Sequence, residues 1–367
     1  MKHHLYDLYK RLVERYFRVR TVGTILVQGG LRLLIALLAT GLVGSIFLRL
    51  ADFKLKIQGG TGNGLPNHIF YAAVAVSAIM IGAGLLLMWR DERREKRKLL
   101  VVIEVRGLHS SPDSPAKDTI KPSFTGQRHP VLVDFRPSLA GELVNPQLML
   151  DKIRGMKLNV ESAVQGRDMS DVFVAIGGVA SVPGLFYVGM RMDDESHFEL
   201  YDWNRDLKRW NPIDGLDDGN RPRPLEIPQM SAEMDEVVLA VSASYLVDDV
   251  AIALSFPSLP VVRMSAKIIQ ANSYWAEEVQ QAFATAFRDA VQEMMTQNIR
   301  RIHLVLAAPA SLAVRLGATY DERLHPELIV YQYERSSTPP YPWGIFLPHH
   351  GSPEPKIHLV ASMGLAR

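Results

Sequence analysis

The chain has 367 residues, of which 22% are charged and 47% are apolar, and its formal net charge is +2 at pH 7. These values are typical of a protein that is partly globular and partly embedded in a membrane. The chain contains no cysteine, which excludes thiolate catalysis, disulfide bonds and cysteine-based metal sites. The absence of disulfides also agrees with a cytosolic location for the globular part.

Residues 1–30 are interpreted as an amphipathic tail. Within residues 1–20, leucine and aromatic residues recur at helical spacing, and lysine and arginine fill the other positions. One interpretation is a helix that lies on an anionic lipid surface. The alternative is a solvated helix that packs on the globular part, and the sequence leaves both open.

Two hydrophobic segments organise the N-terminal part. Residues 69–89 contain no charged side chain, and a helix of that length crosses a hydrocarbon core of roughly 30 Å. The other segment spans about residues 31–50, with Arg32 and Arg49 near its ends, where long side chains reach the lipid headgroups. A cleaved signal peptide is the competing interpretation, but the charged region before it is too long and no small-residue cleavage site follows.

Residues 31–98 are therefore predicted to form a two-helix transmembrane hairpin with a basic linker. The connection between the helices is rich in glycine, which favours a hairpin loop over a phosphate-binding loop because no globular strand and helix flank it. Lysine and arginine are concentrated before the first span and directly after the second, so the positive-inside rule places both termini and the head in the cytoplasm. Small residues within the spans permit close helix packing, although they are also simply common in membrane helices.

From residue 99 onward, short apolar runs alternate with amphipathic stretches, which is typical of an α/β head with largely parallel sheets. The clearest helix spans residues 273–297, with Ser273 as its N-cap and an apolar face that includes Phe283 and Phe287. Residues 211–229 are rich in proline, glycine and aspartate and are predicted to be a linker or long loop. The head is long enough for two α/β units, which we place at residues 99–230 and 231–367.

Few residues point to catalysis. Asp193, Asp194 and Glu195 lie between two strand-like runs, where a polar turn is a better explanation than a metal site. His349 and His350 lack the spacing of a zinc-protease helix. The chain has no nucleophile elbow, no Walker loop and no convincing pair of carboxylates. We therefore expect no catalytic residue, no metal and no cofactor.

The ends of the predicted strands are more informative, because ligands of open α/β sheets lie outside the carboxyl ends of the strands. The strand at residues 302–307 is followed by Ala308 and Pro309, and proline suits the first position of a helix. The backbone N–H groups of Ala310 and Ser311 are then expected to be unpaired and to attract phosphate, with Arg315 one turn further on.

Two more strands end in small or polar residues. Residues 237–241 are followed by Ser242, Ser244 and Tyr245, and residues 172–176 are followed by Gly177 and Gly178, where a ligand can approach the backbone closely. These turns predict a site for a phosphate-bearing ligand. Ordinary strand-to-helix turns have similar residues, and the pattern alone does not separate the two interpretations.

Several motifs resemble one known family when they are taken in chain order. They are GGVASVPGLFYVG, LYDWNRDLKRW, VVLAVSASYLVDD, IHLVLAAPASLAVRLG, LIVYQYER and YPWGI. These segments resemble SAVED domains. Together with the two preceding spans, they resemble the two-transmembrane SAVED effectors of bacterial CBASS antiphage systems.

The resemblance implies a fold class and a function. The implied fold is α/β, with a head of two fused Rossmann-like, or CARF-like, units after the transmembrane hairpin. Such effectors bind a cyclic oligonucleotide, often a cyclic trinucleotide, which a partner nucleotidyltransferase makes after phage infection. Binding drives homo-oligomerisation, and the assembled hairpins disrupt the bacterial inner membrane in abortive infection. The implied partners are the cyclic oligonucleotide, membrane lipid and further copies of the chain, but no DNA.

The resemblance also implies a ligand site across both units. On this chain the site comprises Gly177, Gly178, Trp203, Ser242, Ser244, Tyr245, Pro309, Ala310, Ser311 and Arg315. The indole of Trp203 either stacks on a base or packs in the core, and Arg335 and Trp343 are further candidates. Two rival functions stay open: a membrane-anchored hydrolase that degrades a nucleotide, and a scaffold whose ligand-binding fold is vestigial.

Overall fold

The computed structural model describes residues 21–39, 47–50, 53–56, 67–108, 115–137, 139, 142–192, 198–225, 227–231, 233–351 and 354–360. The contacts within the chain divide it into two units, Met1–Arg97 and Lys98–Arg367. The predicted helix within residues 1–20, the glycine-rich connection and the acidic residues Asp193, Asp194 and Glu195 lie outside the described residues.

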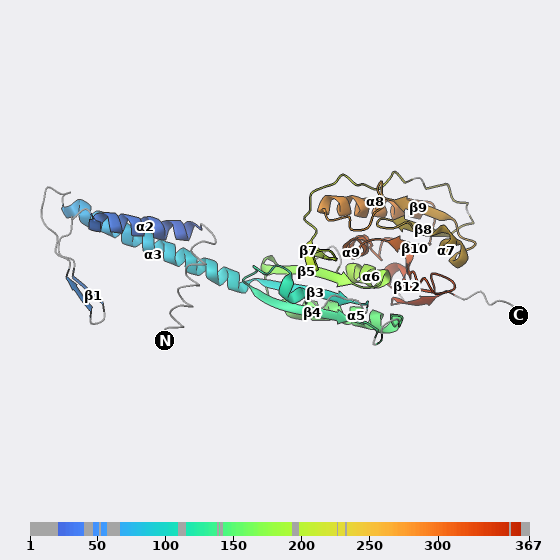
Figure 1. Ribbon diagram of the computed structural model, residues 1–367, viewed down its shortest axis with the longest axis horizontal. Coiled ribbons are helices and arrows are strands. Elements are labelled where there is room, and N and C mark those ends of the chain that lie inside the picture. Colours follow the sequence, from blue (N-terminus) through green and yellow to red (C-terminus); the bar gives the residue numbers. More distant parts are fainter. Residues whose placement is uncertain are drawn as a thin grey trace. The chain divides into compact units, whose positions relative to one another are not determined.

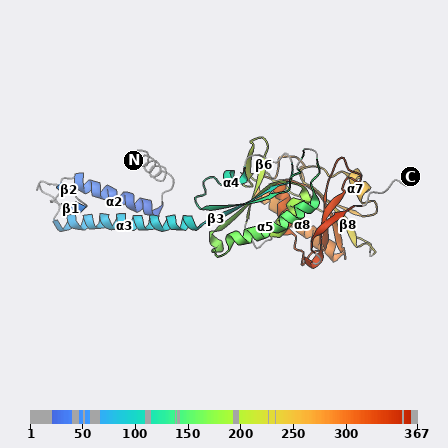
Figure 2. The same ribbon diagram turned by 90° about the horizontal axis from the view of Figure 1, so that it is seen from below.

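In the N-terminal unit, α2 (Val22–Ala39) packs along α3 (Asn67–Arg97), as both views show (Figures 1 and 2). The two helices approach so closely that a Cβ atom added to Gly84 would lie 2.7 Å from the carbonyl oxygen of Gly23. The expectation of close packing through small residues is therefore confirmed at Gly84. Gly82, by contrast, has open space where a Cβ would stand.

The predicted bounds of the first hydrophobic span, residues 31–50, are wrong. The helix begins nine residues earlier, at Val22, and ends at Ala39, whereas β1 (Phe47–Leu50) pairs with the antiparallel β2 (Phe53–Lys56). The reason lies in FKLK, where apolar and basic residues alternate as they do along a strand, and FLRL pairs with it. Among the described residues, Tyr71–Arg97 is long and apolar enough to cross a membrane, and Val22–Leu37 is a shorter apolar helix.

The head contains two sheets that are mostly parallel (Figure 1). Within the described residues, the first sheet has the order β4-β3-β5-β6-β7 and consists of β3 (Leu99–Arg106), β4 (Gln127–Asp134), β5 (Val172–Val179), β6 (Phe198–Asn204) and β7 (Arg209–Pro212). The second has the order β13-β12-β11-β10-β8-β9 and consists of β8 (Glu236–Ser242), β9 (Val261–Ser265), β10 (Arg301–Ala307), β11 (Glu327–Gln332), β12 (Trp343–Leu347) and β13 (Lys356–Leu359).

The helices of the head connect these strands. They are α4 (Ala116–Thr119), α5 (Pro146–Val164), α6 (Val182–Met192), α7 (Asp249–Ser255), α8 (Glu277–Thr296) and α9 (Ala310–Thr319), with short 3-10 turns at Met169–Asp171 and His349–Gly351. The predicted linker at residues 211–229 contains the end of β7, and its other described residues form no helix and no strand beyond an isolated bridge at Pro222. The expected boundary at 230/231 falls between β7 and β8, and its position stays a prediction.

The two sheets are built by the same sequence of steps. In each, the first strand lies between the second and third, all three are parallel, a fourth parallel strand follows, and an antiparallel strand comes next. The long helix α5 in the first unit corresponds to α8 in the second, and α6 corresponds to α9. This repeat is the expected pair of Rossmann-like units.

Within the head, the two α/β units share one apolar core, in which α6 and α9 lie side by side (Figure 1). The first unit is the one built on β3–β7 and the second unit is the one built on β8–β13. Gly189 is the eighth residue of α6 and Gly317 is the eighth residue of α9. A Cβ atom added to Gly189 would collide with the carbonyl oxygen of Val314, and one added to Gly317 would collide with that of Phe186. Each contact joins the eighth residue of one helix to the fifth residue of the other. The helices α6 and α9 therefore cross symmetrically, as expected for equivalent elements of the two repeated units.

The predicted N-cap of the long helix is wrong. α8 begins at Glu277 after Ala276, whose side chain offers no cap, and the hydroxyl of Ser273 donates instead to the carbonyl of Gln270 (2.7 Å). A turn precedes the helix here, because Asn272 and Tyr274 have positive φ angles. The apolar face itself is buried as expected, including Phe283 and Phe287.

Candidate functional site

A pocket of about 460 Å³ lies at the carboxyl ends of β8, β10 and β11. Four tyrosines line it: Tyr245 after β8, Tyr331 and Tyr333 at the end of β11, and Tyr341 before β12. Val182, the first residue of α6, lines the same pocket and belongs to the first unit. The pocket is therefore formed by both units of the head.

The polar character of the pocket comes from neutral groups. Burial raises the pKa of Tyr331 and of Tyr341, so both hydroxyls stay protonated. The hydroxyl of Tyr331 lies 2.9 Å from Nδ1 of His303, which is buried, and is engaged there. Gln332 also lines the pocket, and its amide donates to the carbonyl of Tyr333 (3.0 Å). Among the described lining residues, Asp248 is the single ionisable group other than tyrosine, and its carboxylate caps α7 by accepting from Val250 N–H (2.9 Å). This lining suits flat, uncharged rings better than bare phosphates.

The turn after β8 is fixed by backbone hydrogen bonds. The N–H groups of Ala243 and Ser244 both donate to the carbonyl of Ala307 at the end of β10 (2.9 and 3.0 Å). The hydroxyl of Ser242 accepts from Val247 N–H (3.1 Å). Ser242 and Ser244 thus shape the turn that presents Tyr245, which is 61% exposed.

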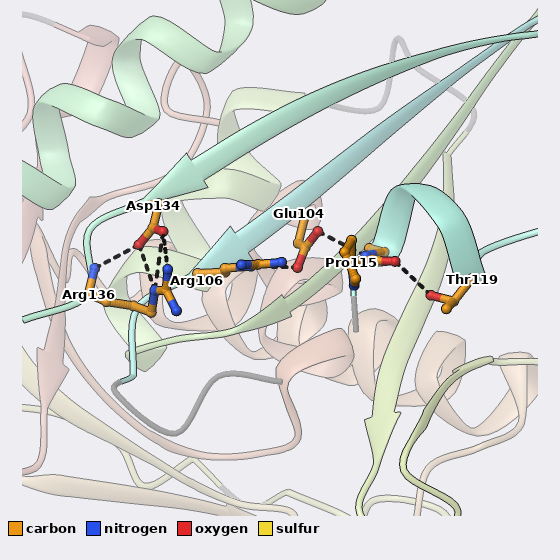
Figure 3. A network of polar contacts seen from close by, with 7 residues as sticks. Glu104, Arg106, Pro115, Thr119, Asp134 and Arg136 are labelled. Carbon is orange, nitrogen blue, oxygen red and sulfur yellow. Dashed lines mark hydrogen bonds and ion pairs between the residues drawn. The ribbon is translucent and has the colours of Figure 1, made fainter. Parts of the chain in front are cut away.

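The first unit has the same turn at the same place. The N–H groups of Gly107 and Leu108 donate to the carbonyl of Val179 at the end of β5 (3.0 and 3.3 Å). Arg106, the last residue of β3, donates through Nε to Glu104, which is buried (2.6 Å; Figure 3). Glu104 also accepts from Ala116 N–H (2.9 Å), so it joins α4 to the outer face of the sheet.

A second ion pair extends this network along β4 (Figure 3). The guanidinium of Arg136 contacts Asp134 at 2.6 Å. Partial burial would raise the pKa of Asp134, but the hydrogen bonds from Arg136 outweigh it and hold the pKa below its usual range. The carboxylate therefore stays ionised. At the carboxyl ends of β3 and β4, each of the two arginines is thus paired with a carboxylate of the same strand or of the residues next to it.

The expectation that the backbone N–H of Ser311 at the start of α9 is unpaired is wrong. Asp202 of β6 reaches across from the first unit, and its Oδ2 accepts from both the backbone N–H (3.2 Å) and the hydroxyl (2.9 Å) of Ser311. Burial raises the pKa of Asp202, although the bonds from Ser311 oppose that shift. A carboxylate of the protein thus occupies the place that an anionic ligand was expected to take. Pro309 is the N-cap residue and Ala310 begins the helix, one position later than predicted.

The side chain of Arg315 binds to residues of α8. It forms an ion pair with Glu277 (2.6 Å) and donates to the side chains of Gln280 (3.1 Å) and Gln281 (3.3 Å). Its side chain is 14% exposed. Its partners explain why it is not among the residues that line the pocket.

The two glycines and Trp203 pack in the sheet. Gly177 and Gly178 lie inside β5, which continues to Val179, so they are not the turn that the sequence predicted. A Cβ at Gly177 would meet the ring of Trp210 at 2.9 Å. Trp203 packs edge-on against the same ring, with centroids 5.5 Å apart, which favours the core-packing interpretation of Trp203.

Of the predicted ligand residues, Tyr245 alone lines the pocket, and Ser242 and Ser244 lie in the same turn. Trp343 is buried within β12. The sequence prediction missed Tyr331, Tyr333 and Tyr341 as lining residues. The segment LIVYQYER carried a usable signal, because its tyrosines stand two apart at the end of a strand and so share one side.

Comparison with known families identifies the chain. Residues 156–347 match the SAVED family, described as the SMODS-associated and fused to various effectors sensor domain. The chain belongs to the SAVED family. Residues 2–150 match a second family, the SAVED-fused 2TM effector domain. The chain therefore joins a SAVED sensor domain to an effector segment of the two-transmembrane class.

Solved SAVED structures are similar to most of the chain at low sequence identity. The Acinetobacter baumannii Cap4 SAVED/CARF-domain receptor with the cyclic trinucleotide 2'3'3'-cAAA is 11% identical, with a TM-score of 0.44 over 73% of this chain and 57% of that chain. The Moraxella osloensis Cap4 receptor is also 11% identical, with a TM-score of 0.43 over 74% of this chain and 56% of that one. The chain thus spans little more than half the length of these receptors. Among curated proteins, none matches the chain significantly.

Proposed function

We propose that this chain is a membrane effector whose SAVED head binds a cyclic oligonucleotide, with a cyclic trinucleotide as the first ligand to test. The observation that carries the proposal is the tyrosine-lined pocket at the carboxyl ends of β8, β10 and β11. Its volume of about 460 Å³ lies within the range of about 300–1,000 Å³ common for ligand sites. Aromatic faces stack on bases of any sequence, each worth about 1–3 kcal/mol.

The site residues proposed for this ligand are Tyr245, Tyr331, Tyr333 and Tyr341, with Ser242 and Ser244 shaping the turn. The pocket offers phosphates no lysine or arginine among its described lining residues. Phosphate contacts therefore fall to backbone N–H groups and to the hydroxyls of Tyr245, Tyr333 and Tyr341, since that of Tyr331 is paired with His303. Because Val182 of the first unit shares the pocket with the second, a bound ligand contacts both units. Binding can then favour one arrangement of the head over another.

The effector part of the proposal concerns the membrane. α2 and α3 form two spans, with the head and both termini in the cytoplasm, in keeping with the arginines that follow the second span. Ligand binding drives the heads to associate, and the hairpins brought together disrupt the inner membrane. Head contacts that do not close into a ring would extend into arrays.

The test is calorimetry of the full chain in lipid nanodiscs against a panel of cyclic dinucleotides and trinucleotides, with linear trinucleotides as controls. Tight binding of one cyclic trinucleotide, followed by larger assemblies in electron micrographs, is the expected result. Absence of binding by every member to a folded head would favour the scaffold. Appearance of cleaved nucleotide during incubation would favour the hydrolase.

A further inference from the structure

The last turns of α3 carry a basic face. Arg90, Arg93, Arg94 and Arg97 line a shallow groove of about 580 Å³ together with Leu86 and Trp89. The spacing of these six residues puts them along one side of the helix, since successive residues are rotated by about 100°. The guanidinium of Arg93 lies 3.7 Å from the centroid of the Trp89 ring, which positions an aromatic ring and a cation together.

The acidic residues of this segment lie on the other side of the helix. Asp91, Glu92 and Glu95 each lie more than a quarter turn from the centre of the arginine face, with Asp91 nearest its edge, about 60° from Arg94. Glu92 pairs with Lys96 (3.1 Å). A helix that is merely solvated usually interleaves the two signs on one face. Here the acidic and basic residues are separated, so the face formed by the four arginines carries positive charge alone.

α2 packs on the side of α3 away from the arginines. Gly84 and Met88 contact Gly23 of α2, and both stand about half a turn from Leu86. Leu86 and Trp89 are correspondingly 63% and 54% exposed. Among the described residues of this unit, the basic face is therefore not covered by α2.

The order of residues along this face matches the layers of a bilayer surface. Leu86 belongs to the charge-free run, Trp89 ends it, and the arginines follow. Tryptophan is enriched at the headgroup level of membranes, and guanidinium groups hold phosphate with paired hydrogen bonds. Two copies of the chain facing each other through these arginines would repel each other, which disfavours a dimer through this face.

We propose that this face of α3 binds the headgroup of an anionic phospholipid, with the phosphate on Arg90, Arg93 and Arg94 and the upper acyl chain against Leu86 and Trp89. The inference rests on the proposed insertion of α3 in a membrane. It adds a lipid site that ties the cytoplasmic end of the span to the leaflet surface, separate from the pocket in the head.

The test uses the full chain in detergent, titrated with phosphatidylglycerol or phosphatidylcholine, with bound lipid counted by native mass spectrometry. The variant is R90Q/R93Q, and the matched control is K96Q/K98Q, which removes the same charge from the last turn of the helix and the residue directly after it. We expect phosphatidylglycerol to bind at least about tenfold more tightly than phosphatidylcholine. R90Q/R93Q should lose most of that difference, and K96Q/K98Q should change it less than about threefold.

Equal losses in the two variants would overturn the inference, because unspecific charge would then explain binding. Displacement of phosphatidylglycerol by millimolar inorganic phosphate would also overturn it, in favour of a free-anion site. Cyclic oligonucleotide binding and carbonate-resistant association with vesicles are measured for the same variants. If the variants and the wild type still bind cyclic oligonucleotide and resist carbonate but show no preference for phosphatidylglycerol, the lipid site is wrong and the proposed function stands. If carbonate extracts the wild-type chain from vesicles, the proposed membrane insertion is wrong, and the lipid site that depends on it is wrong as well.

Discussion

Asp202 of the first unit holds the first turn of α9 in the second unit through Ser311, which donates both its backbone N–H and its hydroxyl to one carboxylate oxygen. The start of a helix carries unpaired N–H groups and a partial positive charge. The partly buried carboxylate of Asp202 in β6 satisfies both needs for Ser311. The helix that was expected to receive a ligand phosphate instead joins the two units of the head.

The first prediction concerns this link. Asp202→Ala leaves the N–H and hydroxyl of Ser311 without their acceptor, and we expect the head to lose about 1–3 kcal/mol of stability. Asp202→Asn keeps an acceptor oxygen and should lose less. Thermal unfolding followed by circular dichroism measures both, with Asp206→Ala as a control because Asp206 makes an exposed contact to Asn272. An equal effect of Asp202→Ala and Asp206→Ala would contradict the assignment.

The second prediction concerns the crossing of α6 and α9. Gly317→Ala places a methyl group against the carbonyl of Phe186, so we expect the helices to separate at a cost of about 1–3 kcal/mol or more. Gly155→Ala is the matched control, because it also replaces a helical glycine but meets open space, and alanine favours a helix by about 1 kcal/mol. Opposite shifts of the melting temperature are expected. A stabilising effect of Gly317→Ala would show that the helices do not cross so closely.

The third prediction is a loss of stability in acid. His303 is buried between Tyr331 and Glu236 (both 2.9 Å), and burial lowers its pKa although Glu236 opposes the shift. The unfolded chain therefore binds a proton more readily than the folded one, and stability falls as the pH drops below about 6.5. His303→Gln should flatten the decline in melting temperature between pH 7.5 and 5.5. His129→Gln, at an exposed position of β4, should leave it unchanged; if the two variants decline in parallel, His303 is not the titrating group.

The fourth prediction tests the pocket. Tyr245→Ala and Tyr333→Ala each remove an exposed ring from its lining, and we expect each to weaken cyclic trinucleotide binding by about 1–3 kcal/mol. Trp203→Phe keeps an aromatic ring beside Trp210, outside the pocket lining, and should bind as wild type does. Calorimetry decides between them. A large loss in Trp203→Phe with none in the tyrosine variants would move the site to the first sheet.

The fifth prediction concerns the N-terminal helices. Gly84→Ala places a methyl group 2.7 Å from the carbonyl of Gly23, whereas Gly82→Ala meets open space. We expect the first variant alone to push α2 and α3 apart. Because the chain has no native cysteine, cysteines introduced at Val22 and Met88 can report this through the yield of a flexible bismaleimide crosslink. Equal yields in the two glycine variants would mean that the helices do not pack through Gly84.

The sequence by itself determined the features that depend on local pattern. The charge-free run at residues 69–89 could only be a long apolar helix, and it lies within α3. The alternation of apolar runs with amphipathic stretches predicted two parallel-rich units, and the order of several motifs pointed to the SAVED family. These features follow from residues that are neighbours in the chain, so their spacing is visible without a structure.

Tertiary structure decided which groups meet. The sequence places Asp202 and Ser311 more than a hundred residues apart, and nothing local shows that one carboxylate fills the helix start. The same holds for Arg315, which Glu277 and two glutamines on α8 engage, and for the tyrosines after β8 and β11 that meet Val182 in one pocket. A helix N-terminus attracts any anion, and whether that anion is a ligand or a side chain depends on contacts between distant segments, which only the packing of the two units sets.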